Sequence, residues 1–326
     1  MGEATMKAIE VREFGGPEVL ELVEVPVPEP SDGQVLIRVD LAGVNFADTG
    51  ARENAYLAEQ ALPLRPGLEV AGKVERASHG FEAGQRVLAL MPNGGYAEYA
   101  LGFNVVTFPL PDRISDHQAL ALLVPGCTAW HICRTFGRIS DGERVLVTAG
   151  AGGVGTVAIQ LARREGAARV VATASTEEKR RLCLELGADA AVDPTGDLGS
   201  ALADSNEGEP FDVVLEMTGG ETFKTCLGAL APFGRIVVYG AASGDPGRLD
   251  ARELMRGSKT ISGFWLSDAA GRGDTGEVLA DLFELVRDGK LTVPDGRIYP
   301  MSEAAQAHAD LQARKTSGKL ALDPGR

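Results

Sequence analysis

The sequence has few cysteines, no long apolar run and no surplus of positive charge, and each shortage excludes a class of protein. Its 326 residues include four Cys, none of which belongs to a Cys-x-x-Cys pair, so neither a disulfide framework nor a zinc ribbon is predicted. Asp and Glu number 46 against 32 Lys and Arg, and the net charge of −14 argues against a nucleic-acid partner. No apolar stretch reaches the roughly 18 residues of a membrane span.

Several catalytic motifs are also missing. There is no Gly-x-Ser-x-Gly and no P-loop, and the four His lie far apart in the sequence, so a hydrolase or a kinase has no support. The first six residues carry neither the apolar core of a secretion signal nor the Ser or Thr of a myristoylation signal. We therefore expect a cytoplasmic protein whose partner is a small molecule, with neither a membrane nor a nucleic acid involved.

Two patterns of secondary structure divide the chain. The first 110 or so residues favour short strands, such as Val19–Val25 and Val35–Leu41, separated by Gly and Pro. From Glu143 to Tyr239 predicted strands and helices alternate, which is typical of a parallel sheet with right-handed crossovers. A helix at Glu277–Arg287 and a strand at Lys319–Leu322 follow, and we expect that strand to return to the first domain. The sequence thus predicts an α/β fold with two domains.

A glycine-rich loop is the strongest functional motif. Residues 150–155 read Gly-x-Gly-x-x-Gly and lie between a predicted strand, Glu143–Thr148, and a predicted helix that ends at Gly166. In this context the glycines permit a tight turn, and the N–H groups at the start of the helix receive a pyrophosphate. The alternative is a turn that only packs the helix on the strand. The predicted cofactor-binding residues of this loop are Gly150, Ala151, Gly152, Gly153, Val154 and Gly155.

The end of the next predicted strand indicates which dinucleotide binds. An acid expected there, roughly 20 residues after the loop, would bind the ribose 2′-hydroxyl of NADH, but the strand ends at Ser175 without a carboxylate. Lys179 and two arginines follow at the start of a helix, where positive charge favours the 2′-phosphate of NADPH. We therefore predict that Ser175 and Lys179 bind NADPH. The alternative is a capping box of Ser175 and Glu178, with the basic residues on a solvated helix face.

Short motifs recur at defined places along the chain. They are residues 15–18 (Gly-Gly-Pro-Glu), 43–48 (Gly-Val-Asn-Phe-Ala-Asp), 66–72 (Pro-Gly-Leu-Glu-Val-Ala-Gly), 94–99 (Gly-Gly-Tyr-Ala-Glu-Tyr), 142–155, 263–266 and 318–319. Together they resemble the zinc-independent quinone oxidoreductase (zeta-crystallin-like) family of the medium-chain dehydrogenase/reductase superfamily. The resemblance implies a GroES-like catalytic domain, residues 1–124 plus 267–326, and an NADP-binding Rossmann domain with a parallel sheet, residues 125–266. It also implies a homodimer.

The resemblance further implies which residues surround the nicotinamide and the substrate. Several implied residues also have an ordinary structural role as an alternative: Asn45 as a turn residue that ends a strand, Asp48 as a cap of the following helix, Tyr56 as a surface aromatic, residues 264–266 as core and Lys319 as a solvated cation. The implied catalytic residues are Asn45, Asp48 and Tyr56. The further implied cofactor-binding residues are Thr128, Gly240, Ala241, Phe264, Trp265, Leu266 and Lys319.

The residues that bind zinc in other members of the superfamily are missing. Zinc alcohol dehydrogenases supply Cys, His and Cys to a catalytic metal, but here residues 45–48 contain no Cys, Leu68 stands at the His position and Val124 falls at the third position. Cys127, His131 and Cys133 are an alternative set, although three ligands on one helix rarely close a tetrahedron. We therefore predict no metal.

These inferences predict an NADPH-dependent reductase that transfers hydride to a quinone or an α,β-unsaturated carbonyl without zinc. In such acceptors the electrons move into an extended system, whereas a simple ketone would need a Lewis acid. One alternative is a reductase of enoyl thioesters or of another biosynthetic enoyl substrate. An alternative of another class is a non-catalytic NADPH-binding protein, crystallin-like or RNA-binding, although the net charge of −14 argues against RNA.

Overall fold

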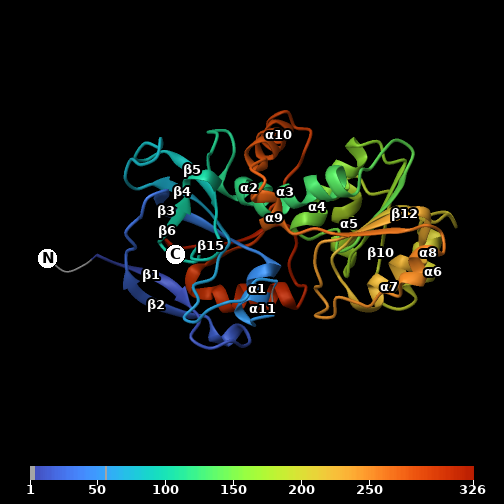
Figure 1. Ribbon diagram of the computed structural model, residues 1–326, viewed down its shortest axis with the longest axis horizontal. Helices are drawn as coiled ribbons and strands as arrows, with labels where there is room; N and C mark the ends of the chain where they lie inside the picture. The colour runs from blue at the N-terminus through green and yellow to red at the C-terminus, as the bar shows by residue number, and fades with distance from the viewer. Residues whose placement is uncertain (1–3, 56) are drawn as a thin grey trace. The chain divides into compact units, whose positions relative to one another are not determined.

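The chain folds into two compact units in the computed structural model, which describes residues 4–55 and 57–326 (Figure 1). The two ends of the chain, up to Pro125 and from Ala270, form unit 1, and residues Gly126–Ala269 form unit 2. Tyr56, a catalytic residue implied by the resemblance, lies outside the described residues. Among those that are described, no helix combines the length and the apolar character that crossing a membrane requires.

Unit 1 is built on a mixed sheet with the strand order β14-β15-β3-β4-β5-β7, in which β6 also pairs with β3. The last strand of the chain, β15, pairs antiparallel with β3 and places Leu320 opposite Val44, so the predicted return of this strand is confirmed. A separate two-stranded ribbon is formed by β1 and β2. The strand bounds are β1 Thr5–Glu10, β2 Glu21–Pro26, β3 Gln34–Val44, β4 Glu69–Val74, β5 Arg86–Leu90, β6 Tyr99–Phe103, β7 Thr107–Pro109, β14 Ile298–Pro300 and β15 Leu320–Asp323.

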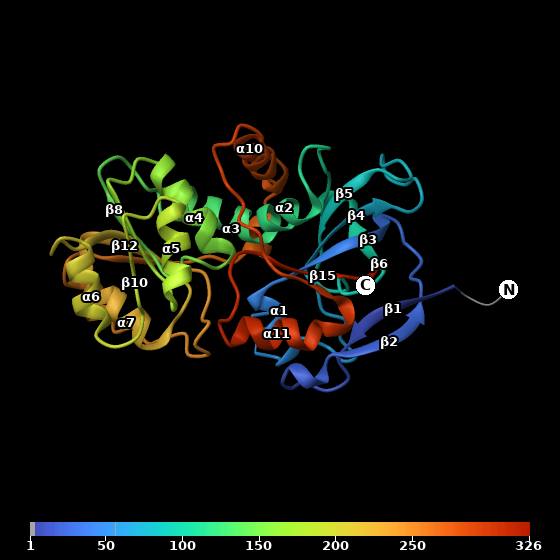
Figure 2. The same ribbon diagram turned by 180° about the vertical axis from the view of Figure 1, so that it is seen from behind.

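Four α-helices of unit 1 accompany these strands, and α11 lies beside α1 (Figures 1 and 2). The core is filled by apolar side chains such as Ile37, Val70 and Val87, whose alternate positions on the strands face inward. The helices are α1 Phe46–Arg52, α2 Asp116–Ala121, α10 Thr275–Arg287 and α11 Ala304–Gln312, with 3₁₀ turns at Pro17–Val19, Asn104–Val106 and Met301–Glu303 and a π-helical turn at Leu122–Gly126.

Unit 2 is a parallel sheet with the strand order β10-β9-β8-β11-β12-β13. Counted along the chain this is 3-2-1-4-5-6, the order of dinucleotide-binding domains, in which the chain reverses direction across the sheet between the first and the fourth strand. The predicted α/β fold class is therefore confirmed. The strands are β8 Arg144–Val147, β9 Arg169–Thr173, β10 Ala190–Val192, β11 Phe211–Glu216, β12 Leu230–Val238 and β13 Thr260–Gly263.

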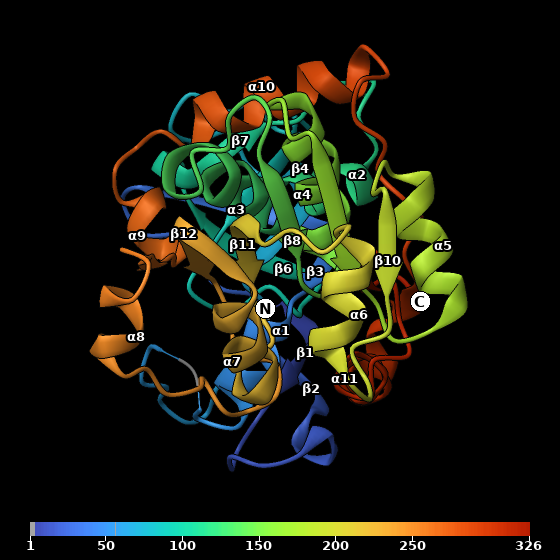
Figure 3. The ribbon, with the colours of Figure 1, turned by 90° about the vertical axis from the view of Figure 1, so that its right-hand side faces the viewer.

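Helices cover both faces of this sheet, with α4 on one face and α6 and α7 on the other (Figure 3). The strands are therefore continuous apolar runs such as Val145–Val147, as expected for a sheet buried on both faces. The helices are α3 Cys127–Trp130, α4 Gly153–Arg164, α5 Glu177–Glu185, α6 Leu198–Ser205, α7 Gly220–Gly228 and α8 Ala251–Met255, a π-helical turn spans His131–Phe136, and α9 is Leu266–Ala270.

Candidate functional site

The glycine-rich loop connects β8 to α4 at the carboxyl end of the sheet of unit 2. The N–H of Gly150 donates to the carbonyl of Thr173 at 2.8 Å, and the N–H of Ala149 donates to the Thr173 hydroxyl at 3.1 Å. Because Thr173 ends β9, these bonds fix the loop against the neighbouring strand. The loop thus lies beside the point where the strand order reverses, which is where open α/β sheets bind their ligands.

The three glycines of the motif differ in how closely their neighbours approach. A Cβ on Gly155 would lie 2.5 Å from the carbonyl oxygen of Ala149, and a Cβ on Gly150 would lie 2.8 Å from the Cβ of Ala172. Gly152 has an ordinary extended backbone, and a Cβ there would approach only the Ala149 oxygen, at 3.2 Å. Packing therefore requires Gly155 and Gly150. Gly152 is the least crowded of the three, because a Cβ there would need the Ala149 oxygen to move by only a few tenths of an ångström.

The first turn of α4 offers unpaired N–H groups to such a ligand. Gly152 is the N-cap and supplies no side-chain hydrogen bond, and the first turn carries no acidic residue. The positive end of a helix of 12 residues therefore faces the loop without a carboxylate to neutralise it. This arrangement suits a phosphate or pyrophosphate group.

The predicted capping box of Ser175 and Glu178 is wrong. Helix α5 is capped by Thr176, whose hydroxyl accepts a hydrogen bond from the N–H of Lys179 at 3.3 Å. Ser175 precedes the cap and lies two residues beyond the end of β9. The hydroxyl of Ser175 is thus not used to start the helix.

Lys179 is followed in α5 by two arginines that pair with acidic side chains. Arg180 bonds to Asp193 at 2.9 Å, and Arg181 pairs with Glu185 one turn further along α5 at 3.5 Å. Burial raises the pKa of the Cys183 thiol to about 12, and the positive charge of Lys179, four residues earlier in α5, acts against that rise. The Cys183 sulfur in turn lies 3.0 Å from where a Cβ of Gly150 would be.

The ends of β11 and β12 form the other side of the reversal point. Glu216, the last residue of β11, is fully buried and accepts hydrogen bonds from the N–H groups of Thr218 at 2.7 Å and Gly219 at 3.1 Å. Burial raises the pKa of its carboxyl group, and these bonds oppose the rise. Gly240 and Ala241 follow β12, and the next residue, Ala242, donates to the Met217 carbonyl at 2.9 Å, so the two loops are joined.

The residue before Gly240 has a buried polar group that needs a partner. The hydroxyl of Tyr239 has no hydrogen-bond partner among the described residues, and burial raises its pKa. An orphaned hydroxyl next to the predicted cofactor-binding residues, together with the open helix start, fits a site that a polar ligand completes.

Other predicted cofactor-binding residues of unit 2 lie in or near its core. Phe264 is 8% exposed, stacks on His131 with ring centres 5.4 Å apart and meets the edge of Phe136 at the same distance. Thr128 is buried in α3, and Trp265 and Leu266 are half-buried. The core alternative is thus correct for Phe264.

In unit 1, Asn45 lies between two charged side chains that the structure buries. Its Nδ2 donates to Glu69 at 2.9 Å, and its Oδ1 accepts from the ammonium group of Lys319 at 2.7 Å. Lys319 also donates to the carbonyl of Val44 at 3.1 Å and forms an ion pair with Glu69. Since Lys319 is 2% exposed, the alternative of a solvated cation is wrong.

Asp48 begins a second chain of buried contacts. It is 1% exposed and accepts hydrogen bonds from the N–H of Asn45 at 2.7 Å and from the hydroxyl of Tyr96 at 3.2 Å. The first bond is half of a capping box of α1, so the capping role predicted as an alternative for Asp48 is confirmed. The Tyr96 hydroxyl lies 3.0 Å from Nε2 of His308, and Nδ1 of that ring lies 3.2 Å from the guanidinium group of Arg52.

Burial changes the protonation of this chain. It raises the pKa of Asp48 to about 7, although the Asn45 hydrogen bond and the charge of Lys319 lower it. Burial and the nearby charge of Arg52 lower the pKa of His308 to about 3, so its ring is neutral at physiological pH.

Sequence reasoning missed Glu69, Tyr96, His308 and Arg52. For Glu69 a signal was available, because its carboxylate directly precedes the apolar run Val70–Ala71 and a charge inside a buried strand needs a partner.

The residues at the zinc positions of related enzymes carry no ligand atoms. Leu68 precedes β4, and Val124 contributes its backbone N–H to Glu69 at 3.0 Å. Within residues 4–55 and 57–326, no three His, Cys, Asp or Glu side chains come together as a metal would need. The alternative set on residues 127–133 is thus not assembled.

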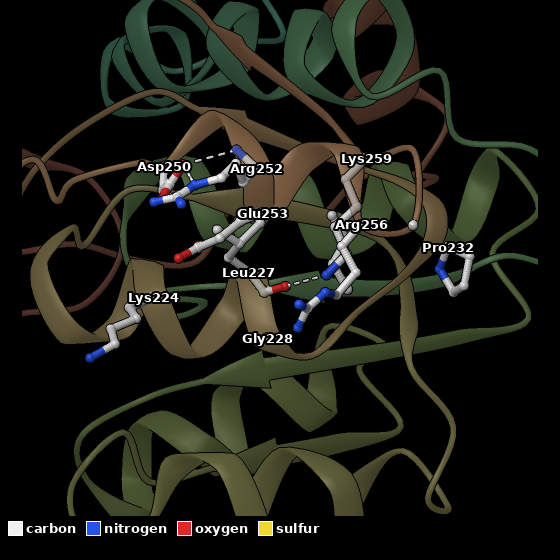
Figure 4. A pocket seen from close by; sticks show the side chains of 11 residues that line it. Lys224, Leu227, Gly228, Pro232, Asp250, Arg252, Glu253, Arg256 and Lys259 are labelled. Carbon is white, nitrogen blue, oxygen red and sulfur yellow. Dashed lines mark hydrogen bonds and ion pairs between the residues drawn. The ribbon is translucent and has the colours of Figure 1, made fainter.

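A hollow of unit 2, about 720 Å³ in volume, lies at the start of β12 (Figure 4). Several basic side chains line it, but Arg252 is paired with Asp250 at 2.6 Å, and Lys259 donates to the carbonyl of Leu227 at 2.7 Å. Lys224 lies 3.7 Å from Glu221. Since the acids and carbonyls of the chain already bind these cations, this hollow is a poor candidate for the cofactor site.

Comparisons with known proteins agree with this architecture. The family model described as an alcohol dehydrogenase GroES-like domain matches residues 31–112, and the model described as a zinc-binding dehydrogenase matches residues 153–284. The quinone oxidoreductase of Lama guanicoe is 35% identical over 98% of each chain. That of Pseudomonas aeruginosa is 33% identical over 98% of this chain and 99% of its own.

Solved structures give the same result. The Escherichia coli quinone oxidoreductase, solved in complex with NADPH, matches with a TM-score of 0.90 and 30% identity over 98% of this chain and 100% of that one. The Thermus thermophilus quinone oxidoreductase, also solved with NADPH, matches with a TM-score of 0.82 and 37% identity over the same shares.

The Rossmann sheet of unit 2 and the GroES-like sheet of unit 1 define a medium-chain dehydrogenase/reductase. Within that superfamily, the full-length relatives show that the chain belongs to the quinone oxidoreductase (zeta-crystallin-like) family. The family resemblance predicted from the sequence motifs is therefore confirmed.

Proposed function

We propose that the protein is an NADPH-dependent reductase that transfers hydride to a quinone or an α,β-unsaturated carbonyl without zinc. The observation that carries the proposal is the glycine-rich loop at the reversal point of the sheet, beside a strand that ends without a carboxylate and a helix, α5, whose first turn holds Lys179 along with Glu177 and Glu178. The NADPH complexes of the Escherichia coli and Thermus thermophilus relatives support this choice of cofactor.

NADPH, when bound, supplies the hydride. The N–H groups at the start of α4 would hold its pyrophosphate, and Ser175 and Lys179 would hold its 2′-phosphate. Gly240 and Ala241, at the end of β12, follow the rule that ligands bind at the carboxyl ends of parallel strands. Asn45, Asp48 and Tyr56 remain the proposed residues around the nicotinamide and substrate.

The proposed acceptors follow from the residue chemistry at the zinc positions. Leu68 and Val124 offer no ligand side chain, so a polarised hydrogen bond, rather than a Lewis acid, must stabilise charge on the acceptor oxygen. Quinones and enones need least stabilisation because their electrons spread over a conjugated system.

Steady-state oxidation of NADPH and NADH with a quinone, an enal and an enoyl thioester tests the proposal. We expect turnover with NADPH, a higher kcat/KM than with NADH, and preference for the quinone or the enal. Preference for NADH, or for the thioester, would contradict the proposal. Tight NADPH binding without turnover of any acceptor would instead support a non-catalytic binding protein.

A further inference from the structure

A buried ion pair contacts both ends of one proposed active-site side chain. Glu69 is 0% exposed and Lys319 is 2% exposed, and together they hold the amide of Asn45. All three N–H bonds of the Lys319 ammonium group have acceptors within unit 1, namely the Val44 carbonyl, Asn45 Oδ1 and Glu69. The positive charge of Lys319 is therefore directed at the side chain of Asn45 and its neighbours.

These contacts fix the orientation of the Asn45 amide. An ammonium group only donates, so the atom that faces Lys319 is the amide oxygen, and a carboxylate only accepts, so the atom that faces Glu69 is the amide nitrogen. A flipped amide would bring oxygen against carboxylate and N–H against ammonium. Asn45 therefore has its oxygen occupied and one of its two N–H bonds used.

The pair also polarises the amide. The cation at the oxygen end withdraws electron density from the amide and makes its N–H groups stronger donors, while the carboxylate at the nitrogen end accepts one of them and holds the group in place. The second N–H on Nδ2 has no acceptor among the described residues. Asn45 as a whole residue is 9% exposed, more than Glu69 at 0% and Lys319 at 2%.

We propose that Glu69 and Lys319 are positioning residues that hold the Asn45 amide with one N–H ready to donate to the oxygen of the hydride acceptor. This inference rests on the proposed function. When an enone accepts hydride at its β-carbon, the electrons of the C=C bond move toward the carbonyl and the oxygen gains negative charge. The N–H of Asn45 stabilises that charge until a proton from water completes the product.

The amide of Asn45 can offer only a donor to a ligand. A ribose hydroxyl can donate or accept, but a carbonyl oxygen only accepts. Since Lys319 occupies the Asn45 oxygen, the amide presents a donor, which matches the carbonyl oxygen. Lys319 therefore acts through Asn45, which is a different role from direct contact with the cofactor.

The test is a mutant cycle between Asn45 and the pair. Glu69→Gln combined with Lys319→Met removes both charges together, so no single buried charge is left, and Asn45→Ala removes the amide. We expect the Glu69→Gln and Lys319→Met double variant, and separately Asn45→Ala, to lower kcat with a quinone or enone about tenfold or more, with little change in the Kd of NADPH. The combined variant should be no slower than Asn45→Ala, because the pair has nothing left to position.

Matched measurements keep the test independent of stability. Val74→Ala, on the same strand as Glu69 and 1% exposed, is a core substitution that should lower stability and leave kcat unchanged. NMR provides a second readout: the side-chain N–H₂ signals of Asn45 should shift when a dead-end complex of NADP⁺ and acceptor forms, and this shift should be lost in the Glu69→Gln and Lys319→Met double variant. If that variant fails to fold, Glu69→Gln alone should still weaken the shift.

The outcomes separate the two proposals. If the wild-type protein does not oxidise NADPH with any of the acceptors, the proposed function is refuted and this inference with it. If the wild-type protein is active, two results would overturn the positioning role alone. One is a combined variant in which the kcat losses multiply, and the other is an Asn45 signal that does not shift when the acceptor binds.

Discussion

Arg52 sets the direction of the hydrogen bonds that lead to Asp48. Its guanidinium group only donates, so Nδ1 of His308 must accept, and the proton of the neutral ring is on Nε2. Nε2–H then donates to the Tyr96 hydroxyl, and the Tyr96 O–H donates to Asp48. A single side chain at one end thus fixes the tautomer and rotamer of the rest.

Removal of the Tyr96 hydroxyl should therefore destabilise unit 1. Tyr96→Phe leaves Nε2–H of His308 buried without an acceptor and takes one donor from Asp48, so we expect the free energy of unfolding to fall by about 2 kcal/mol. Urea denaturation measures it. Tyr99→Phe, a half-buried tyrosine of the same unit, is the control and should change stability by less than about 0.5 kcal/mol. Equal effects would contradict the directed chain.

The raised pKa of Asp48 predicts how stability depends on pH. Its folded pKa is about 7 and its unfolded pKa is about 3.9, so the folded state holds the proton more tightly and loses stability as the pH rises from about 4 to 7. Asp48→Asn mimics the protonated side chain and does not titrate. We expect the wild type to lose up to about 4 kcal/mol relative to Asp48→Asn over this range.

Urea unfolding at several pH values measures that difference. His308, whose lowered pKa favours stability at higher pH, is present in both proteins, so its contribution cancels in the comparison. A constant difference, or one of opposite sign, would show that Asp48 is ionised throughout.

At the scale of elements, different glycines of the loop between β8 and α4 serve packing and cofactor binding. Gly155→Ala would bring a Cβ within 2.5 Å of the Ala149 oxygen, so we expect a loss of about 2 kcal/mol in stability. Gly152→Ala should destabilise the free protein less than Gly155→Ala does but raise the Kd of NADPH about tenfold. Thermal unfolding and a fluorescence titration measure both. Unchanged NADPH binding in Gly152→Ala would contradict a cofactor site at this loop.

The elements around this loop were predictable from the sequence because local signals agree there. The strand predicted after the glycine motif forms as β9, Arg169–Thr173, and α4 begins at the glycine motif and ends before Gly166. Helix α5 was predicted too, but the alternative of a capping box at Ser175 was wrong, since Thr176 is the N-cap. Neighbouring hydroxyl residues compete for that position, and only the backbone path decides between them.

The contacts of unit 1 were less predictable because they join distant parts of the sequence. Lys319 meets Glu69 across 250 residues, and Arg52 meets His308 across 256. Local patterns placed Lys319 on the final strand but gave no partner for it. Only the pairing of β15 with β3 brings its ammonium group to Asn45.

At the scale of the whole molecule, the proposed chemistry should not depend on a metal. Leu68 and Val124 supply no ligand side chain, so we expect dialysis against a chelator to leave activity unchanged and to shift Tm by less than about 1 °C. Elemental analysis of the active protein should find far less than one zinc per chain. Activity that is lost on dialysis and restored by zinc would contradict the proposed mechanism.

The net charge of the whole molecule also bears on the selection of NADPH. A chain of net charge −14 repels an anionic cofactor, so a few cations near the binding site must offset that repulsion. Isothermal titration of the wild type and Lys179→Ala with NADPH and NADH measures it most directly, with Lys224→Ala as an exposed-lysine control. We expect the wild type to bind NADPH at least about tenfold more tightly than NADH, and Lys179→Ala alone to lose most of that difference. Equal affinities in the wild type, or a difference that survives Lys179→Ala, would contradict a 2′-phosphate site at the start of α5.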